Sequence, residues 1–206
     1  MEQAETLSQI FERFSYGERP RLNEVEFLLK AGSSLLPALA SASRRVKLSL
    51  RGDVVSYSRK VFIPLTRLCR NSCAYCGFRQ PQPKPGEIYL KPRQVLALAE
   101  AGARAGCFEA LFTLGEKPEE KFVEAERELK QLGYGSTIEY LYECCRLVFK
   151  HAGLLPHSNP GILTREELKM LREVNVSLGL MLENVSPRLR GKGCLLYTSP
   201  SPRDRG

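Results

Sequence analysis

The sequence lacks any long apolar segment. No run of apolar residues approaches the roughly 20 that a helix needs to cross a membrane, and the acidic start Met1-Glu2-Gln3-Ala4-Glu5 is unlike a signal peptide. These two absences predict a cytoplasmic protein with no membrane partner. Disulfides are rare in that compartment, so the seven cysteines indicate metal binding.

Concentrated positive charge is also lacking. The chain of 206 residues carries 31 Lys and Arg against 23 Asp and Glu, which gives a formal net charge of +8. An excess of this size would suit an anionic partner. However, the basic residues are scattered, and no basic run is interleaved with aromatic residues. We therefore expect a solvated basic surface and no nucleic-acid partner.

What the sequence does contain is a short cysteine loop. Cys69, Cys73 and Cys76 are separated by three and then by two residues, directly after an apolar run over Val61–Leu65. A closed structural zinc site needs four ligands, and iron–sulfur clusters usually take four cysteines as well. Three cysteines therefore indicate a cubane cluster with one iron left open for a substrate. A zinc site completed by a further cysteine remains the alternative, and otherwise the further cysteines are expected in the core. The candidate fourth ligands of such a zinc site are Cys107, Cys144 and Cys145.

The cysteine loop resembles that of the radical S-adenosylmethionine (SAM) superfamily, including the aromatic Tyr75 before the last cysteine. The resemblance implies a [4Fe–4S] cluster on the three cysteines, with SAM bound at the open iron. It also implies reductive cleavage of SAM to a 5′-deoxyadenosyl radical that abstracts a hydrogen atom from the substrate. Tyr75 would then lie beside the cluster and the adenine. Gly115 and Glu116 resemble a Gly-Gly-Glu element that holds the methionine amino group of SAM, with Leu114 in place of its first glycine.

The first quarter of the chain is predicted to be helical. Three helices are expected, around residues 7–14, from Asn23 to Gly32 and over Leu36–Val46. Asn23 and Glu26 have the spacing of a capping box at the start of the second helix. We interpret residues 1–53 as a helical cover with a structural role.

Strand and helix patterns alternate after residue 54. The expected strands are Val61–Leu65, Glu109–Leu114, a third opened by Leu154 and Leu155, and Ser177–Leu182. The expected helices are Pro92–Ala105, Pro118–Leu132, Thr137–His151 and Thr164–Val174, the last with a capping box of Thr164 and Glu167. This alternation predicts an α/β fold of right-handed βαβ units around a parallel sheet. The resemblance implies that this α/β fold is a radical SAM barrel of the TIM type.

Polar residues follow each predicted strand. They are the cysteines, Gly115-Glu116, Ser158-Asn159 after His157, and Glu183-Asn184. In barrels of this kind the chemistry gathers where the strands end. We therefore expect Ser158, Asn159 and Glu183 to contact SAM or substrate, and His157 to be a turn residue rather than a proton shuttle.

Four βα units are too few for a barrel, which needs about six strands when partial and eight when closed. The segment 194–206 has no relation to the preceding pattern and resembles the translation of a DNA-library adapter. We expect residues 54–193 to be a partial barrel, truncated after about four units, and residues 194–206 to be a non-native tail.

Segments that flank the cysteine loop resemble the 7,8-didemethyl-8-hydroxy-5-deazariboflavin synthase family. They are residues 57–70, 109–119, 154–161 and 179–186. The resemblance implies a lyase of coenzyme F-420 biosynthesis. Its substrate would be a hydroxybenzyl–ribityliminouracil adduct, which loses ammonia and closes a tricyclic ring after hydrogen abstraction. Implied partners are the radical SAM subunit that joins tyrosine to 5-amino-6-ribitylaminouracil and an electron-donor protein.

Three alternatives stay open from the sequence. One is the partner activity itself, the transferase that joins tyrosine to the diaminouracil. The second is a futalosine-pathway or biotin-type radical enzyme. The third is a non-enzymatic zinc or iron–sulfur binding module.

Overall fold

The computed structural model describes residues 2–30 and 32–181 and divides the chain into two compact units, Met1–Tyr57 and Ser58–Gly206. The division lies four residues beyond the boundary predicted at residue 53. The predicted tail 194–206 and the candidate residue Glu183 lie outside the described residues. In the described part, no helix combines the length and the apolarity that a membrane crossing requires.

The first unit is helical, as expected. Its elements are α1 (Glu2–Ser15), α2 (Leu22–Lys30), a 3-10 turn η1 (Ser33–Leu35) and α3 (Leu36–Arg51). Helices α1 and α3 contact each other, and Leu7 and Ile10 of α1 are buried together with Ala42 of α3. Helix α3 continues one turn beyond the predicted end at Val46.

The predicted capping box of Asn23 and Glu26 is wrong. Helix α2 begins at Leu22, so Asn23 lies within its first turn. Arg21 is the N-cap residue of α2, and its carbonyl accepts from the backbone N–H groups of Glu24 and Val25. The Glu24 carboxylate in turn accepts from the Arg21 N–H at 2.8 Å. The reciprocal half of a capping box is therefore present two residues earlier than expected.

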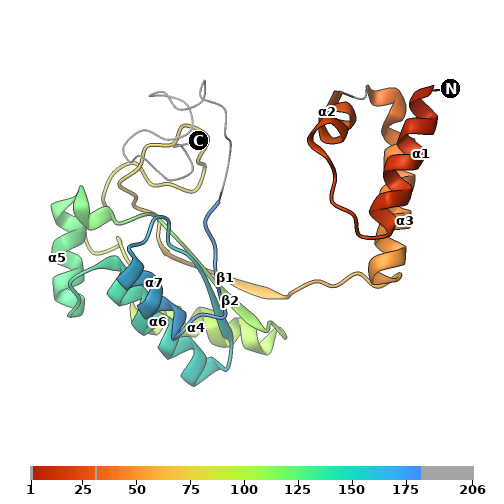
Figure 1. Cartoon of the computed structure of the whole chain (residues 1–206). Coiled ribbons are helices and arrows are strands. Elements are labelled where there is room, and N and C mark those ends of the chain that lie inside the picture. Colours follow the sequence, from red (N-terminus) through yellow and green to blue (C-terminus); the bar gives the residue numbers. More distant parts are fainter. Residues whose placement is uncertain (1, 31, 182–206) are drawn as a thin grey trace. The chain divides into compact units, whose positions relative to one another are not determined.

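The second unit is a four-stranded parallel sheet in the order β1-β2-β3-β4, connected by helices (Figure 1). The strands are β1 (Lys60–Thr66), β2 (Glu109–Leu114), β3 (Leu155–Asn159) and β4 (Ser177–Leu178). The helical elements are α4 (Pro92–Arg104), the 3-10 turn η2 (Pro118–Glu120), α5 (Val123–Leu132), α6 (Thr137–Ala152) and α7 (Arg165–Arg172). The predicted α/β alternation with a parallel sheet is confirmed.

Three predicted elements of the second unit differ from the structure by two residues or more. The helix expected over residues 118–132 is interrupted, because Phe122 takes an extended conformation (φ −120°, ψ 115°) and caps α5. Helix α7 ends at Arg172, two residues earlier than expected, although its capping box of Thr164 and Glu167 is confirmed. Strand β4 covers Ser177–Leu178, the predicted residues 179–181 are not in a strand, and the last predicted residue, 182, lies outside the described part.

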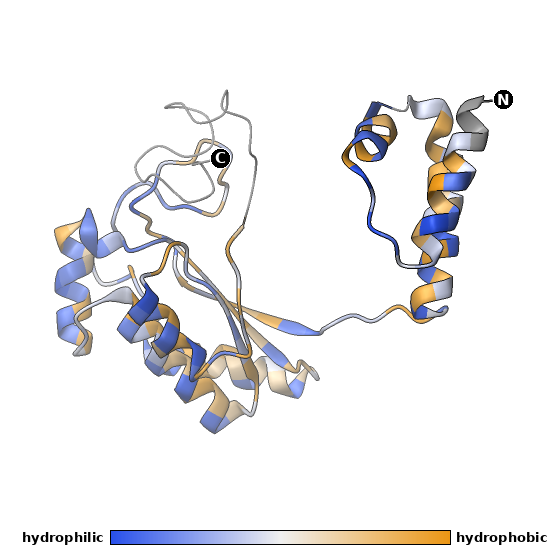
Figure 2. Cartoon of the chain, viewed as in Figure 1, coloured by the Kyte–Doolittle hydropathy of each residue, from blue (hydrophilic) through white to orange (hydrophobic). Residues whose placement is uncertain are grey.

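Alternation along the strands gives the sheet two different faces. Ile63 and Leu65 of β1 and Ala110 and Phe112 of β2 are buried on the face that α4 and α6 cover. Each of these helices carries both hydrophobic and hydrophilic residues along its length (Figure 2). The strand residues that alternate with the buried ones point to the opposite side of the sheet, which we call the inner face. The hydrophobic core of the second unit therefore lies between the sheet and these helices.

A buried carboxylate holds the segment between the cysteine loop and α4. Glu128 of α5 is 3% exposed. Its oxygens accept from the backbone N–H groups of Gly86, Ile88 and Tyr89 at 3.1 to 3.3 Å, and from the Lys91 ammonium. A buried charge is stable only when it is hydrogen-bonded in this way. Glu128 therefore fixes the path of the chain into α4.

The Glu128→Gln variant is expected to unfold at lower urea concentration. One carboxylate oxygen becomes an NH₂ group that cannot accept from backbone N–H, and each lost charged hydrogen bond costs about 1.5–3 kcal/mol. Glu126→Gln is the matched control on the same helix, because water screens its exposed pair with Lys130 and the pair contributes little to stability. Equal urea midpoints for the two variants would contradict the role assigned to Glu128.

Candidate active site at the strand ends

The cysteine loop begins where β1 ends, and its two ends are tied together. The Gln80 N–H donates to the Arg67 carbonyl at 2.8 Å, and Arg67 Nε donates to the Phe78 carbonyl at 2.9 Å. The three cysteines between these ties are partly exposed. Within residues 2–30 and 32–181, no three His, Cys, Asp or Glu side chains are already gathered into a metal-binding group. Cys69, Cys73 and Cys76 thus share one loop, and their role as ligands stays a prediction.

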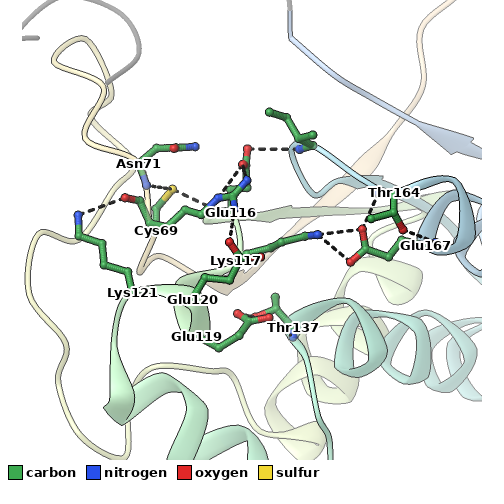
Figure 3. Close-up of polar contacts among 12 residues, drawn as sticks. Cys69, Asn71, Glu116, Lys117, Glu119, Glu120, Lys121, Thr137, Thr164 and Glu167 are labelled. Atoms are coloured by element: carbon green, nitrogen blue, oxygen red, sulfur yellow. Dashed lines mark hydrogen bonds and ion pairs between the residues drawn. The ribbon is translucent and has the colours of Figure 1, made fainter. Parts of the chain in front are cut away.

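The sulfur of Cys69 faces two backbone N–H groups. Its Sγ accepts from Asn71 N–H at 3.4 Å and from Glu116 N–H at 3.2 Å (Figure 3). Burial raises the pKa of the Cys69 thiol, and the two hydrogen bonds oppose that rise in pKa because they favour the thiolate. N–H groups directed at sulfur are the surroundings that a ligating thiolate needs.

Gly115 allows β2 to approach the cysteine loop. A Cβ at this position would lie 1.9 Å from the Leu68 carbonyl oxygen and 2.9 Å from Cys69 Cβ. The Gly115 N–H also donates to the Thr66 carbonyl at 2.8 Å, and the Arg70 N–H donates to the Glu116 carbonyl at 3.0 Å. The absent side chain is therefore what lets the first and second strand ends bond directly.

Glu116 is a buried carboxylate between three segments. It is 6% exposed, and its Oε1 accepts from Nε and Nη2 of Arg70, the former at 3.0 Å. Its Oε2 accepts from the Ile162 N–H at 3.3 Å. The next residue, Lys117, pairs with Glu167 at 2.7 Å at the start of α7 (Figure 3). The structure therefore places Glu116 beside Cys69, with both of its oxygens hydrogen-bonded by the chain. Its contact with SAM stays a prediction.

Ser158 and Asn159, which were predicted together as site residues, point to opposite faces at the end of β3. Asn159 lies on the inner face, and its buried Oδ1 has no hydrogen-bond partner among the residues that the structure describes. Ser158 points to the helices, is fully buried, and donates to Asn175 Oδ1 at 2.7 Å. The structure brings Asn159 to the strand ends and does not bring Ser158 there. Strand alternation is the reason.

The remaining candidates take different positions. Tyr75 is 51% exposed in the cysteine loop. His157 is on the inner face of β3, where its Nδ1 is hydrogen-bonded with Ser177 Oγ of β4. Arg70, which contacts the predicted site residue Glu116, and Lys117, which pairs with Glu167, were missed by sequence reasoning. The only local signal for them was their position next to Cys69 and Glu116, since their partners are 46 and 50 residues away.

The further cysteines do not approach Cys69. Cys107 precedes β2, at the end of the sheet opposite the cysteine loop. Cys144 and Cys145 are buried in α6 on the helix-covered face, and burial raises the pKa of the Cys145 thiol to about 12. The predicted core role of these cysteines agrees with their positions. A zinc site that uses one of them together with the cysteine loop is not formed in the described part.

A cavity of about 800 Å³ lies apart from the strand ends. It is lined mainly by α6 and by residues 173–176, and none of the predicted site residues lines it. Three cysteines in one loop, N–H donors directed at Cys69 and an unpartnered acceptor at Asn159 instead fit a cluster and a polar ligand at the strand ends.

The family comparison agrees with this arrangement. The sequence profile of the Radical SAM superfamily matches residues 63–196. This match extends over more than half of the chain and includes all three cysteines of the loop. The chain belongs to the radical SAM superfamily.

Individual relatives are more specific. The chain is 52% identical over 136 residues to the 7,8-didemethyl-8-hydroxy-5-deazariboflavin synthase of Methanopyrus kandleri, which covers 66% of this chain and 41% of that protein. It is 39% identical over 215 residues to the FO synthase of Mycobacterium tuberculosis, which covers 96% of this chain and 25% of that protein. The chain thus spans about two fifths of the archaeal relative and a quarter of the mycobacterial one.

Solved structures share the fold. Methylornithine synthase matches with a TM-score of 0.66 at 21% identity, over 87% of this chain and 49% of that one. The FeFe-hydrogenase maturase HydG from Carboxydothermus hydrogenoformans matches with a TM-score of 0.69 at 23% identity, over 95% of this chain and 42% of that one. The predicted fold class, an α/β fold of the radical SAM barrel type, is confirmed, and the described residues form four of its strands.

The Gly115→Ala variant is expected to lower the thermal midpoint of unfolding. Its Cβ would meet the Leu68 carbonyl oxygen at 1.9 Å, and overpacking of this kind typically costs about 1–3 kcal/mol. Gly77→Ala is the control in the same loop, because a Cβ there meets no atom within 4 Å. Circular dichroism melts would check both, and an unchanged midpoint for Gly115→Ala would refute the close approach.

Proposed function

We propose that this chain belongs to a radical SAM enzyme that makes the deazaflavin 7,8-didemethyl-8-hydroxy-5-deazariboflavin. The observation that carries the proposal is the 52% identity to a deazariboflavin synthase over 136 residues. FO synthases of Mycobacterium tuberculosis and Nocardia farcinica, at 39% and 42% identity, support the same reaction class.

Under this proposal Cys69, Cys73 and Cys76 hold a [4Fe–4S] cluster with one open iron. When bound, the cluster and SAM supply a 5′-deoxyadenosyl radical for hydrogen abstraction. The Glu116 carboxylate suits the ammonium group of SAM, and the exposed ring of Tyr75 suits its adenine. Asn159 Oδ1, an acceptor without a partner in the described part, suits a hydroxyl or amine donor of the ligand.

The inner face offers surroundings for an aromatic, polyhydroxylated substrate. Phe62, Leu111 and His157 are neighbours across β1, β2 and β3. Thr113 and Asn159 are paired one layer nearer the strand ends. The apolar layer would exclude water from a ring, while the polar layer would bind hydroxyl groups. This arrangement suits the adduct of a hydroxybenzyl group with a ribityliminouracil as substrate. Ammonia loss with ring closure as the reaction rests on the similarity to deazariboflavin synthases.

The reaction is tested on a version of the protein extended to the full length of its archaeal relatives. Anaerobically reconstituted protein is incubated with SAM, a reductant and the adduct. We expect ammonia, 5′-deoxyadenosine and a fluorescent deazaflavin. Product formation only from tyrosine plus 5-amino-6-ribitylaminouracil would assign the partner transferase reaction instead. A protein that binds zinc and leaves SAM intact would be a binding module.

Replacing any one loop cysteine is expected to remove most of the iron. Cys69→Ala, Cys73→Ala or Cys76→Ala leaves two thiolates, which cannot hold a cubane cluster that already has one open iron. Cys107→Ala is the control, because Cys107 lies at the opposite end of the sheet. Iron and sulfide per chain, measured after anaerobic reconstitution, show whether the loss of a loop cysteine removes the cluster. Wild-type iron content in a loop variant would exclude the three-cysteine cluster.

A further inference from the structure

The side chain of Arg70 joins two carboxylates beside the cysteine loop. Its Nε and Nη2 donate to Glu116 Oε1, and its Nη1 donates to Glu120. The side chains of Arg70 and Glu116 are 20% and 7% exposed, whereas that of Glu120 is 47% exposed. Water screens a shielded ion pair less than an exposed one, so the Arg70–Glu116 contact is the stronger of the two.

The backbone around Arg70 bonds to the same segment. The Arg70 N–H donates to the Glu116 carbonyl at 3.0 Å, and the Arg70 carbonyl accepts from Lys121 Nζ at 3.1 Å. The neighbouring Cys69 sulfur accepts from the Glu116 N–H at 3.2 Å. Residues 69–70 are therefore attached to residues 116–121 by main-chain and side-chain contacts together.

The Glu116 carboxylate extends this connection to the third strand end. Its Oε2 accepts from the Ile162 N–H at 3.3 Å. Gly161 leaves room for the carboxylate, because a Cβ there would lie 2.3 Å from Oε2, and its φ of +84° favours glycine. The loops after β1, β2 and β3 thus meet at one buried carboxylate whose position depends on Arg70.

We propose that Arg70 is a positioning residue that fixes Cys69 against the loops after β2 and β3 before any cofactor binds. By holding Glu116 and Glu120, it keeps the carboxylate in reach of Ile162 and the Cys69 sulfur in reach of the Glu116 N–H. The inference rests on the proposed function only for the role of Cys69 as a cluster ligand.

Hydrogen exchange at single residues of the cluster-free protein tests the positioning role. In Arg70→Gln the amides of Ile162 and Glu116 are expected to exchange at least about tenfold faster, since hydrogen bonds to charged groups are worth more than one factor of ten. Amides within β2 and β3 are expected to keep their rates. Ile162 is the informative site, because it is far from Arg70 in sequence and connected to it through Glu116.

Two further variants separate positioning from charge and from general stability. Arg67→Gln removes the same charge from the same loop, and Arg67 contacts Phe78 rather than Glu116; we expect wild-type exchange at Ile162. Arg70→Lys keeps the charge but lacks the planar fork that reaches both carboxylates, so its exchange rate should fall between wild type and Arg70→Gln. If Arg70→Gln does not fold, the comparison of Arg70→Lys with Arg67→Gln carries the test.

Wild-type exchange at Ile162 in Arg70→Gln would overturn the proposal. Uniformly faster exchange in β2 and β3 as well would also overturn it, since Arg70 would then support the whole sheet. Iron loss is the second readout: after reconstitution, Arg70→Gln should release iron to a chelator severalfold faster than the wild-type protein. A wild-type protein that takes up no iron would contradict the proposed function, while the exchange result would still decide the role of Arg70.

Discussion

The burial of one carboxylate determines the arrangement of the candidate site. Removing a charged group from water is costly unless its oxygens are hydrogen-bonded. Glu116 meets this condition with the guanidinium of Arg70 on one oxygen and the Ile162 N–H on the other. These groups come from the loops after three different strands. The hydrogen bonds that this one buried side chain needs therefore hold the three loops together. The cysteine loop is the first of them, so its position follows from the same contact.

Glycine positions make this burial possible. Gly115 lets the second strand end approach Leu68 and Cys69, and Gly161 leaves space for the carboxylate of Glu116. With the strand ends this close, the groups that point at the Cys69 sulfur are backbone N–H groups and not side chains. The site therefore depends on close backbone approach at the strand ends, which a parallel sheet brings to one edge. The helix-covered face contributes the core and carries none of the loop cysteines.

Much of the architecture could be predicted from local patterns. The strand and helix alternation, the cysteine loop after β1 and the capping box of Thr164 and Glu167 all depend on residues close in sequence. The same local reasoning misplaced the cap of α2, because Arg21 and Glu24 satisfy the helix start as well as the expected pair would. It also missed the break at Phe122, where side-chain packing against the core overrides helical propensity.

The sequence by itself determined the class of protein, because three cysteines at this spacing and the alternating elements are contiguous features. Only the tertiary structure decided which strand-end residues share the site. It turned Ser158 toward the helices and Asn159 toward the inner face, and it paired Arg70 with a carboxylate 46 residues away. Strand register sets such directions and distances, and register is a property of the assembled sheet rather than of any one segment.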